Sequence, residues 1–333
     1  MRPPPGLGIV VIGRNEGERL RVCLESVVDA ARPVVYVDSG SSDGSAALAR
    51  TFGAVVVELD GSTPFAPGRA RNEGFRRLRE LLPGLRHVQF VDGDCEIVAG
   101  WLRKAAAFLD AHPDVAVVGG QLCERDPERS VYNLLCAVEW ETHAVGEAAA
   151  CAGNALMRAD AFAAIKGYRI DLVGGEEPEL CQRLRAAGWR IWCLADRMAL
   201  HDAAMTRFGQ WWNRAMRSGY ASLQHLEACD AFPDSRRVRR VLGVWFWALL
   251  LPVAILMLVV AWSASAAWLL MLYPLQLAKL CARGGQQGPG ALRRNCWYAA
   301  FLVLAKFPRL AGQFAYLLRR CLRARPRLID YKS

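Results

Sequence analysis

The sequence Val91-Asp92-Gly93-Asp94-Cys95 directly continues the apolar run that begins at His87. Alternate residues of an extended chain share one face, so the carboxylates of Asp92 and Asp94 can point into the same crevice. Two carboxylates held this close repel each other unless a cation lies beside them. Mg²⁺ and Mn²⁺ prefer oxygen ligands and also bind phosphate, so the stretch indicates a metal site for a nucleoside diphosphate. Asp-x-Asp also occurs in solvated turns, so the choice between a metal site and a turn depends on the other residues of the chain.

Strand-like and helix-like segments alternate around this stretch. The helix expected after the first strand, for example, places Leu20, Cys23 and Leu24 with a period of 3.6 residues. Such alternation predicts an α/β fold, a Rossmann-like and mostly parallel sheet with helices on both faces. Strands are expected at 8–13, 34–37, 54–59, 87–91, 115–118 and 151–157.

Polar residues follow three of these strands. Arg14-Asn15-Glu16 follows the first, Asp38 ends the second, and Asp92 ends the fourth. Ligands bind at the carboxyl ends of the strands in such sheets, so these groups are expected to meet at one edge. Neither G-x-G-x-x-G nor a P-loop is present, which argues against dinucleotide and P-loop sites. Phosphates would therefore need a metal ion and arginines.

A second acidic group occurs in Gly174-Gly175-Glu176-Glu177-Pro178. Pro178 suits the first position of a helix that we expect to end near Ala187, with the preceding carboxylate as its cap. The helix dipole favours an ionised carboxylate there, which is suited to accept a proton from a hydroxyl group. The alternative is that Glu177 only caps the helix.

Seven elements in this order resemble the family 2 glycosyltransferases, inverting enzymes with the GT-A fold. The resemblance covers roughly residues 8–225. Its elements are Val11-Ile12-Gly13-Arg14-Asn15-Glu16, Val37-Asp38-Ser39-Gly40-Ser41-Ser42-Asp43-Gly44-Ser45, Ala70-Arg71-Asn72-Glu73-Gly74, Asp92-Gly93-Asp94, Gly153-Asn154-Ala155, Gly174-Gly175-Glu176-Glu177 and His201.

The resemblance implies roles on the donor side. Glu16 and Asp38 match contacts to the base and ribose of the donor nucleotide, and Arg71 matches a residue near the diphosphate or the base. Asp92 and Asp94 match the metal motif, with Asp94 the more direct ligand.

The remaining matches concern the sugar and the acceptor. His201 lies where related enzymes bring a histidine to the metal or diphosphate, and Asn154 would face the sugar or acceptor. Glu177 falls on the catalytic base of the family's Glu-Asp motif. Because this sequence has Glu rather than Asp there, either Glu176 or Glu177 could be the base.

The segment Met205 to Arg214 stands where processive synthases carry Gln-x-x-Arg-Trp. The absence of that motif favours transfer of a single sugar. Trp211 and Trp212 could stack on an acceptor sugar or form an aromatic belt at a membrane. Glu139, on a helix expected from Ser130 to Ala144, is a further acceptor candidate.

The last hundred residues indicate a membrane domain. The 333-residue chain is 53% apolar, and Val241 to Trp262 contains no charge, enough to cross a bilayer core of about 30 Å. We expect a catalytic domain over 1–230 and a membrane domain over 231–333, with spans near 241–262 and 264–280. Segment 296–318 is expected to be interfacial or re-entrant, with a third span as the alternative.

Charge gives the orientation. The net charge is +10, and arginine clusters flank the apolar segments, which indicates contact with anionic lipids rather than nucleic acid. The positive-inside rule then predicts the cytoplasmic face of the inner (plasma) membrane. The 11 cysteines show no paired spacing and are expected to be reduced.

The sequence therefore predicts metal-dependent, inverting transfer of one sugar, using Mg²⁺ or Mn²⁺. The donor would be a nucleotide sugar, with UDP the commonest family choice, and the acceptor a lipid-linked or cell-envelope glycan. The alternative is a catalytically silent nucleotide-sugar-binding or scaffold subunit of a glycan assembly complex. A sugar-phosphate nucleotidyltransferase is disfavoured, because its glycine-rich, lysine-bearing loop is missing.

Overall fold

The computed structural model describes residues 6–29, 32–140, 144–228, 235–285 and 290–322. The chain divides into two compact units. The first consists of residues 1–126 and 140–203, and the second of residues 127–139 and 204–333. The domain boundary expected at residue 230 lies outside the described residues, and the units divide about one helix earlier.

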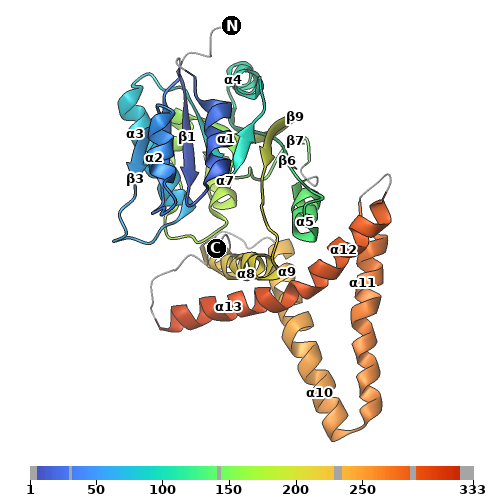
Figure 1. The fold of residues 1–333 in the computed structure, drawn as a ribbon. Coiled ribbons are helices and arrows are strands. Elements are labelled where there is room, and N and C mark those ends of the chain that lie inside the picture. Colours follow the sequence, from blue (N-terminus) through green and yellow to red (C-terminus); the bar gives the residue numbers. More distant parts are fainter. Residues whose placement is uncertain (1–5, 30–31, 141–143, 229–234, 286–289, 323–333) are drawn as a thin grey trace. The chain divides into compact units, whose positions relative to one another are not determined.

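The first unit is built on a nine-stranded sheet, and the described helices flank it (Figure 1). The strand order is β3-β2-β1-β4-β8-β6-β9-β5, and β7 pairs with β9. The strands are β1 (Leu7–Gly13), β2 (Val34–Asp38), β3 (Val55–Glu58), β4 (His87–Asp92), β5 (Cys95–Ile97), β6 (Val115–Glu124), β7 (Gly146–Glu147), β8 (Ala155–Arg158) and β9 (Arg190–His201). The helices are α1 (Glu18–Val27), α2 (Ser45–Thr51), α3 (Pro67–Leu81), α4 (Trp101–Ala111), α6 (Ala159–Ala164) and α7 (Glu176–Ala186).

Alternation along the buried strands produces two cores. Ile9 and Val11 of β1 pack with the buried faces of α1 and α4, whereas Val10 and Ile12 pack with those of α3, α6 and α7. Each buried valine or isoleucine contributes about 1.5–3 kcal/mol relative to an exposed one. A strand apolar on both faces is thus stable only when helices cover both sides.

The fold class predicted from the sequence is confirmed. Strands β3, β2, β1 and β4 are parallel neighbours, as are β6 and β9, while the other pairs are antiparallel. Gly13 lies opposite Asp38, and Ile12 lies opposite Asp92, so the carboxyl ends of β1, β2 and β4 meet at one edge.

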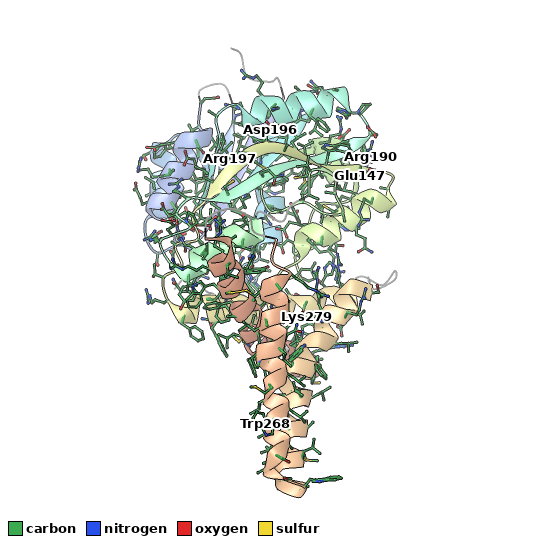
Figure 2. The ribbon with its side chains drawn as sticks, turned by 90° about the vertical axis from the view of Figure 1, so that its right-hand side faces the viewer. Glu147, Arg190, Asp196, Arg197, Trp268 and Lys279 are labelled. Carbon is green, nitrogen blue, oxygen red and sulfur yellow. A yellow bond between two sulfur atoms is a disulfide. The ribbon has the colours of Figure 1, made fainter. Side chains whose placement is uncertain are left out.

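Several elements differ from their predicted extents. β6 continues to Glu124 instead of ending at Val118, because it pairs along β9 through three register shifts. The strand predicted over 151–157 is reduced to β8. A further short strand, β7, pairs with β9, and Glu147 of β7 forms an ion pair with Arg190 of β9 at 3.0 Å (Figure 2).

The described part of the second unit is helical. One helix, α5 (Val131–Trp140), begins in this unit, and residues 141–143 of its predicted extension lie outside the described residues. The others are α8 (Phe208–Ala228), α9 (Ser235–Trp245), η1 (Phe246–Leu250), α10 (Leu251–Ala261), η2 (Ala264–Met271), α11 (Leu272–Ala282), α12 (Ala291–Leu304) and α13 (Lys306–Cys321).

Three helical stretches are long and apolar enough to cross a membrane: Arg237–Ala261, Ala264–Ala282 and Ala291–Cys321. The first two coincide with the predicted spans and form a hairpin on which Trp268 is 75% exposed (Figure 2). By length and composition, Ala291–Cys321 also qualifies. This stretch divides at Ala305 into α12 and α13, and Pro308 lies in the first turn of α13, where a missing N–H is tolerated. The arginines beyond residue 322 lie outside the described residues.

α8 and α13 pack side by side within the second unit (Figure 1). A Cβ atom on Gly219 of α8 would lie 2.1 Å from the Arg309 carbonyl oxygen, and one on Gly312 of α13 would lie 1.9 Å from that of Met216. The two backbones therefore touch where both helices carry glycine.

The expectation that the cysteines are all reduced is wrong for one pair. A disulfide joins Cys281 at the end of α11 to Cys296 on α12, with Cα atoms 4.9 Å apart. The sequence alone does not indicate this pair, because the two cysteines are 15 positions apart. They come together only because α11 and α12 pack against each other. Eight other described cysteines are free thiols.

Candidate functional site

The carboxylates of Asp92 and Asp94 have different partners. Asp92 is the last residue of β4, and the Gly93 N–H donates to the Ile12 carbonyl at 2.8 Å, which fixes the turn into β5. Asp92 Oδ1 accepts from Arg71 Nη2 at 2.9 Å. Asp94 Oδ2 instead lies 3.7 Å from His201 Nε2.

Asp94 and His201 form a donor pair that fits a divalent cation. Ligands that are neighbours in an octahedron around Mg²⁺ lie about 3 Å apart, so the present separation needs only a small adjustment. Among the described residues, no group of three or more His, Cys, Asp or Glu side chains is arranged to hold a metal ion. The pair would thus supply two ligands and leave the rest to phosphate and water, as is usual for Mg²⁺.

Arg71 connects Asp92 to the acidic pair on α7. It lies on α3 and is 2% exposed. Besides Asp92, its Nη1 donates to Glu176 Oε1 at 3.2 Å and to Glu177 Oε1 at 3.1 Å. The guanidinium carbon lies 5.4 Å from the centre of the Tyr168 ring, an attractive cation–π distance. Together these contacts hold the guanidinium beside three carboxylates, and its expected place near the diphosphate or the base stays a prediction.

The acidic pair stands in the first turn of α7, which begins at Glu176 and not at Pro178 as predicted. Its N-cap is Gly175, with φ of +82°, a conformation that glycine adopts without strain, and no side chain caps the helix. The alternative that Glu177 only caps α7 is therefore wrong. Burial and the charge of Glu176 raise the pKa of Glu177 to about 7, although Arg71 opposes the shift.

Gly153 lies against this cluster. A Cβ atom there would stand 2.4 Å from Arg71 Nη2, 2.8 Å from Asp92 Oδ2 and 3.3 Å from Glu177 Oε1. Only a residue without a side chain lets the chain pass so close to all three.

Asn154 forms hydrogen bonds to the metal motif from within the protein, and its expected contact with the sugar or acceptor stays a prediction. It is 2% exposed, its Oδ1 accepts from the Asp92 backbone N–H at 2.9 Å, and its Nδ2 donates to Cys95 Sγ at 3.3 Å. Cys95 Sγ in turn lies 3.5 Å from Asp94 Oδ1. Both ends of the amide are used to fix Asp92 and Cys95.

Asp38 and Glu16 reach the expected edge but are engaged with the protein. Asp38 accepts hydrogen bonds from the hydroxyl of Tyr36 and the backbone N–H groups of Gly40 and Ser41, at 2.8–3.0 Å. It thereby shapes the loop after β2. Glu16 is buried and pairs with Arg19 at 2.9 Å. The donor-binding roles of both stay predictions.

The acceptor candidates all belong to the second unit. Trp211 is 6% exposed and packs edge-to-face on Phe301, at 4.8 Å between ring centres. Trp211 therefore takes part in the packing of α8 against α12. Trp212 is half-buried beside the same cluster, and Glu139 pairs with Arg214 at 2.8 Å. No contact here tests an acceptor role, which stays a prediction.

Sequence reasoning did not identify Glu124. It ends β6, and its carboxylate lies 2.7 Å from His201 Nδ1. In the sequence, Glu124 is only a charged residue at the end of an apolar segment. Its place beside His201 follows from the pairing of β6 with β9. Tyr168, packed on Arg71, was missed for the same reason.

Sequence comparison finds similarity to known glycosyltransferases. The model of the family described as Glycosyl transferase family 2 matches residues 8–166. Glycosyltransferase AglE of Haloferax volcanii is 23% identical over 260 residues, which are 74% of this chain and 80% of AglE.

A solved mannosyltransferase structure supports the fold. Mannosyltransferase PcManGT from Pyrobaculum calidifontis, in complex with GDP-Man and Mn²⁺, has a TM-score of 0.53 at 18% identity and covers 97% of this chain and 87% of its own. Glucosyl-3-phosphoglycerate synthase from Mycobacterium tuberculosis, with Mn²⁺, UDP and glucosyl-3-phosphoglycerate, has a TM-score of 0.47 at 18% identity, covering 69% and 81%.

Proposed function

Since residues 8–166 form a glycosyl transferase family 2 domain of GT-A fold, we propose that this glycosyltransferase inverts the anomeric centre of its donor and adds one sugar per reaction. The donor is a nucleotide sugar. The acceptor is a lipid-linked or cell-envelope glycan. The proposed base is Glu177, and the diphosphate is proposed to lie at Asp92, Asp94 and His201.

One observation carries the proposal: a single guanidinium joins Asp92 of the metal motif to Glu177. Arg71 donates to both carboxylates, at 2.9 and 3.1 Å. In an inverting transfer, the base and the leaving diphosphate must lie on opposite sides of one sugar ring. Because one guanidinium reaches both carboxylates, we assign Asp92 and Glu177 to one site.

Glu177 suits the base better than Glu176. A general base works best when its pKa is near the operating pH, and Glu177 has a pKa of about 7. Its side chain is also more exposed than that of Glu176, 17% against 5%. Deprotonation of an acceptor hydroxyl by Glu177 would let that hydroxyl attack the anomeric carbon from the face opposite the diphosphate.

Asp94 and His201 are proposed to hold a divalent cation, which when bound neutralises negative charge on the leaving diphosphate. The imidazole nitrogen makes this donor set softer than an all-oxygen site, which favours Mn²⁺ over Mg²⁺. Arg71 pairs with Asp92, so we assign the carboxylate ligand beside His201 to Asp94.

The apolar helices support an acceptor in or near a membrane. Basic residues flank the hairpin at 236–240 and from Lys279 to Arg294, which favours the cytoplasmic face of the inner membrane. We assign catalysis to the first unit and anchoring to the second, where α13 carries a polar face suited to the interface.

The test is turnover by the purified full chain with a panel of nucleotide sugars, with and without Mn²⁺, beside Asp94→Ala and Glu177→Gln. Loss of transfer in both variants, with an inverted anomeric product from the wild type, is expected. Full activity in both variants would refute the assignment. Binding of a nucleotide sugar without turnover on any acceptor would favour the catalytically silent subunit instead.

A further inference from the structure

We propose that Glu124 is a positioning residue: it fixes the His201 imidazole so that Nε2 faces Asp94 with its lone pair available to a metal ion. This inference rests on the proposed function, because it assumes a cation between Asp94 and His201. It adds a residue that neither the motifs nor the family match assigns.

The strand register places the three side chains together. His201, the last residue of β9, lies opposite Glu124 of β6 in a parallel pair and opposite Cys95 of β5 in an antiparallel pair. The Asp202 N–H donates to the Asp94 carbonyl at 3.0 Å, and the Arg125 N–H donates to the His201 carbonyl at 2.8 Å. The backbone of His201 is thus held on both sides before its side chain is considered.

The hydrogen bonds then determine the tautomer. An ionised carboxylate can only accept, so the contact of 2.7 Å between His201 Nδ1 and Glu124 Oε2 requires a proton on Nδ1. In the neutral imidazole, Nε2 is then unprotonated, and it points toward Asp94 Oδ2 at 3.7 Å. A carboxylate behind a metal-binding histidine typically fixes the ring and raises its basicity.

The surroundings of Glu124 support a role in positioning His201. Its side chain is 0% exposed, and a buried carboxylate is costly unless donors compensate it. The second oxygen, Oε1, accepts from the Ala203 N–H at 2.9 Å, so each oxygen serves the chain around His201. The Trp140 ring stands edge-on to the imidazole, 5.3 Å between centres, and limits its rotation.

Glutamine at position 124 would break this arrangement without changing its size. A glutamine offers one acceptor and one amino group, whereas Nδ1–H and the Ala203 N–H both need an acceptor. If the amino group faces His201, the ring must take the other tautomer, with a proton on Nε2. If the amino group faces Ala203 instead, it points at the Ala203 N–H, which is also a donor, and no hydrogen bond can form.

The experiment is a Mn²⁺ titration of the metal-free full chain in detergent, with free Mn²⁺ measured by electron paramagnetic resonance. Glu124→Gln is expected to weaken Mn²⁺ binding about 10–100-fold. The matched control is Glu96→Gln, on the neighbouring strand β5, where Glu96 pairs with Arg125. It should bind Mn²⁺ within about twofold of wild type.

His201→Ala separates positioning from general damage. If Glu124 acts through the imidazole, Glu124→Gln adds no loss of Mn²⁺ affinity in the His201→Ala background. An equal loss in both backgrounds, wild-type affinity in Glu124→Gln, or no Mn²⁺ binding by wild type would each overturn the inference. Absence of sugar transfer alongside the expected Mn²⁺ pattern would overturn only the proposed function.

Discussion

Replacing Arg71 with methionine tests the centre of the candidate site. The change keeps an unbranched chain of similar length but leaves Asp92, Glu176 and Glu177 without their shared cation. Removing one partner of a buried ion pair typically costs about 3–5 kcal/mol, since the remaining charge stays buried. Each kcal/mol lowers the melting temperature by about 2–4 °C in a domain of this size, so a fall of about 6–20 °C is expected.

The loss of stability in Arg71→Met should also depend on pH. Arg71 opposes the raised pKa of Glu177, so its removal moves that pKa further above 7. A carboxyl group whose pKa is raised in the folded protein contributes stability that is lost as pH rises through that pKa. The stability gap between Arg71→Met and wild type should therefore be smallest near pH 6 and widen toward pH 9.

The assay is thermal unfolding in detergent over that pH range, with transfer rates measured alongside. Arg76→Met on the same helix is the control, because Arg76 pairs with Glu73 and Glu80 at the surface, where such pairs are worth less than about 1 kcal/mol. If Arg71→Met melts within 2–3 °C of the control, or if the gap does not change with pH, the reasoning about a buried charge cluster is wrong.

Three further changes test other parts of the structure. Gly153→Ala should reduce transfer at least tenfold and cost about 1–3 kcal/mol, because its Cβ would lie 2.4 Å from Arg71 Nη2; Gly119→Ala, with open space around it, is the neutral control in the same kinetic and unfolding assays. The wild-type rate of transfer should rise with pH through about 7 as Glu177 ionises, and a flat rate profile between pH 6 and 8 would contradict the assignment of Glu177 as base. Gly312→Leu should separate α8 from α13, since a Cβ would lie 1.9 Å from the Met216 carbonyl oxygen; a melting temperature equal to that of Gly243→Leu, where the space is open, would show that the helices tolerate it.

The sequence predicted well those features that depend on neighbouring residues. Strand β1 is apolar on both faces, and this local pattern sufficed to predict helices on both sides of the sheet. The ends of β2 and β4 were placed correctly, so Asp38 and Asp92 were expected at the edge where they are found. The start of α7 was missed because Pro178 suggested a first helical position, whereas the positive φ of Gly175 begins the helix two residues earlier.

Side-chain partners that come from distant segments could not be predicted in this way. Arg71 reaches Glu177 across 106 positions in the chain, and nothing in the spacing of the two residues specifies that contact. Glu124 meets His201 only because β6 and β9 pair through irregular register shifts, which a period of two residues does not reveal. Family resemblance implies that Asn154 contacts the sugar or acceptor, but it did not indicate the hydrogen bond from the Asp92 N–H to the Asn154 side chain.

Asp92→Asn should shift the pH dependence in the direction opposite to Arg71→Met. The charge of Asp92 helps to raise the pKa of Glu177, and Asp92 also accepts a hydrogen bond from Arg71. A neutral side chain at position 92 removes the repulsion between Asp92 and Glu177. The charge of Arg71 is then shared only with Glu176 and Glu177, so the pKa of Glu177 falls below about 7. Residual transfer by Asp92→Asn, although slow, should reach its plateau at lower pH than that of wild type. A plateau at the same or higher pH would show that Asp92 and Glu177 are not electrostatically coupled through Arg71, and the joint role given to this guanidinium would have to be abandoned.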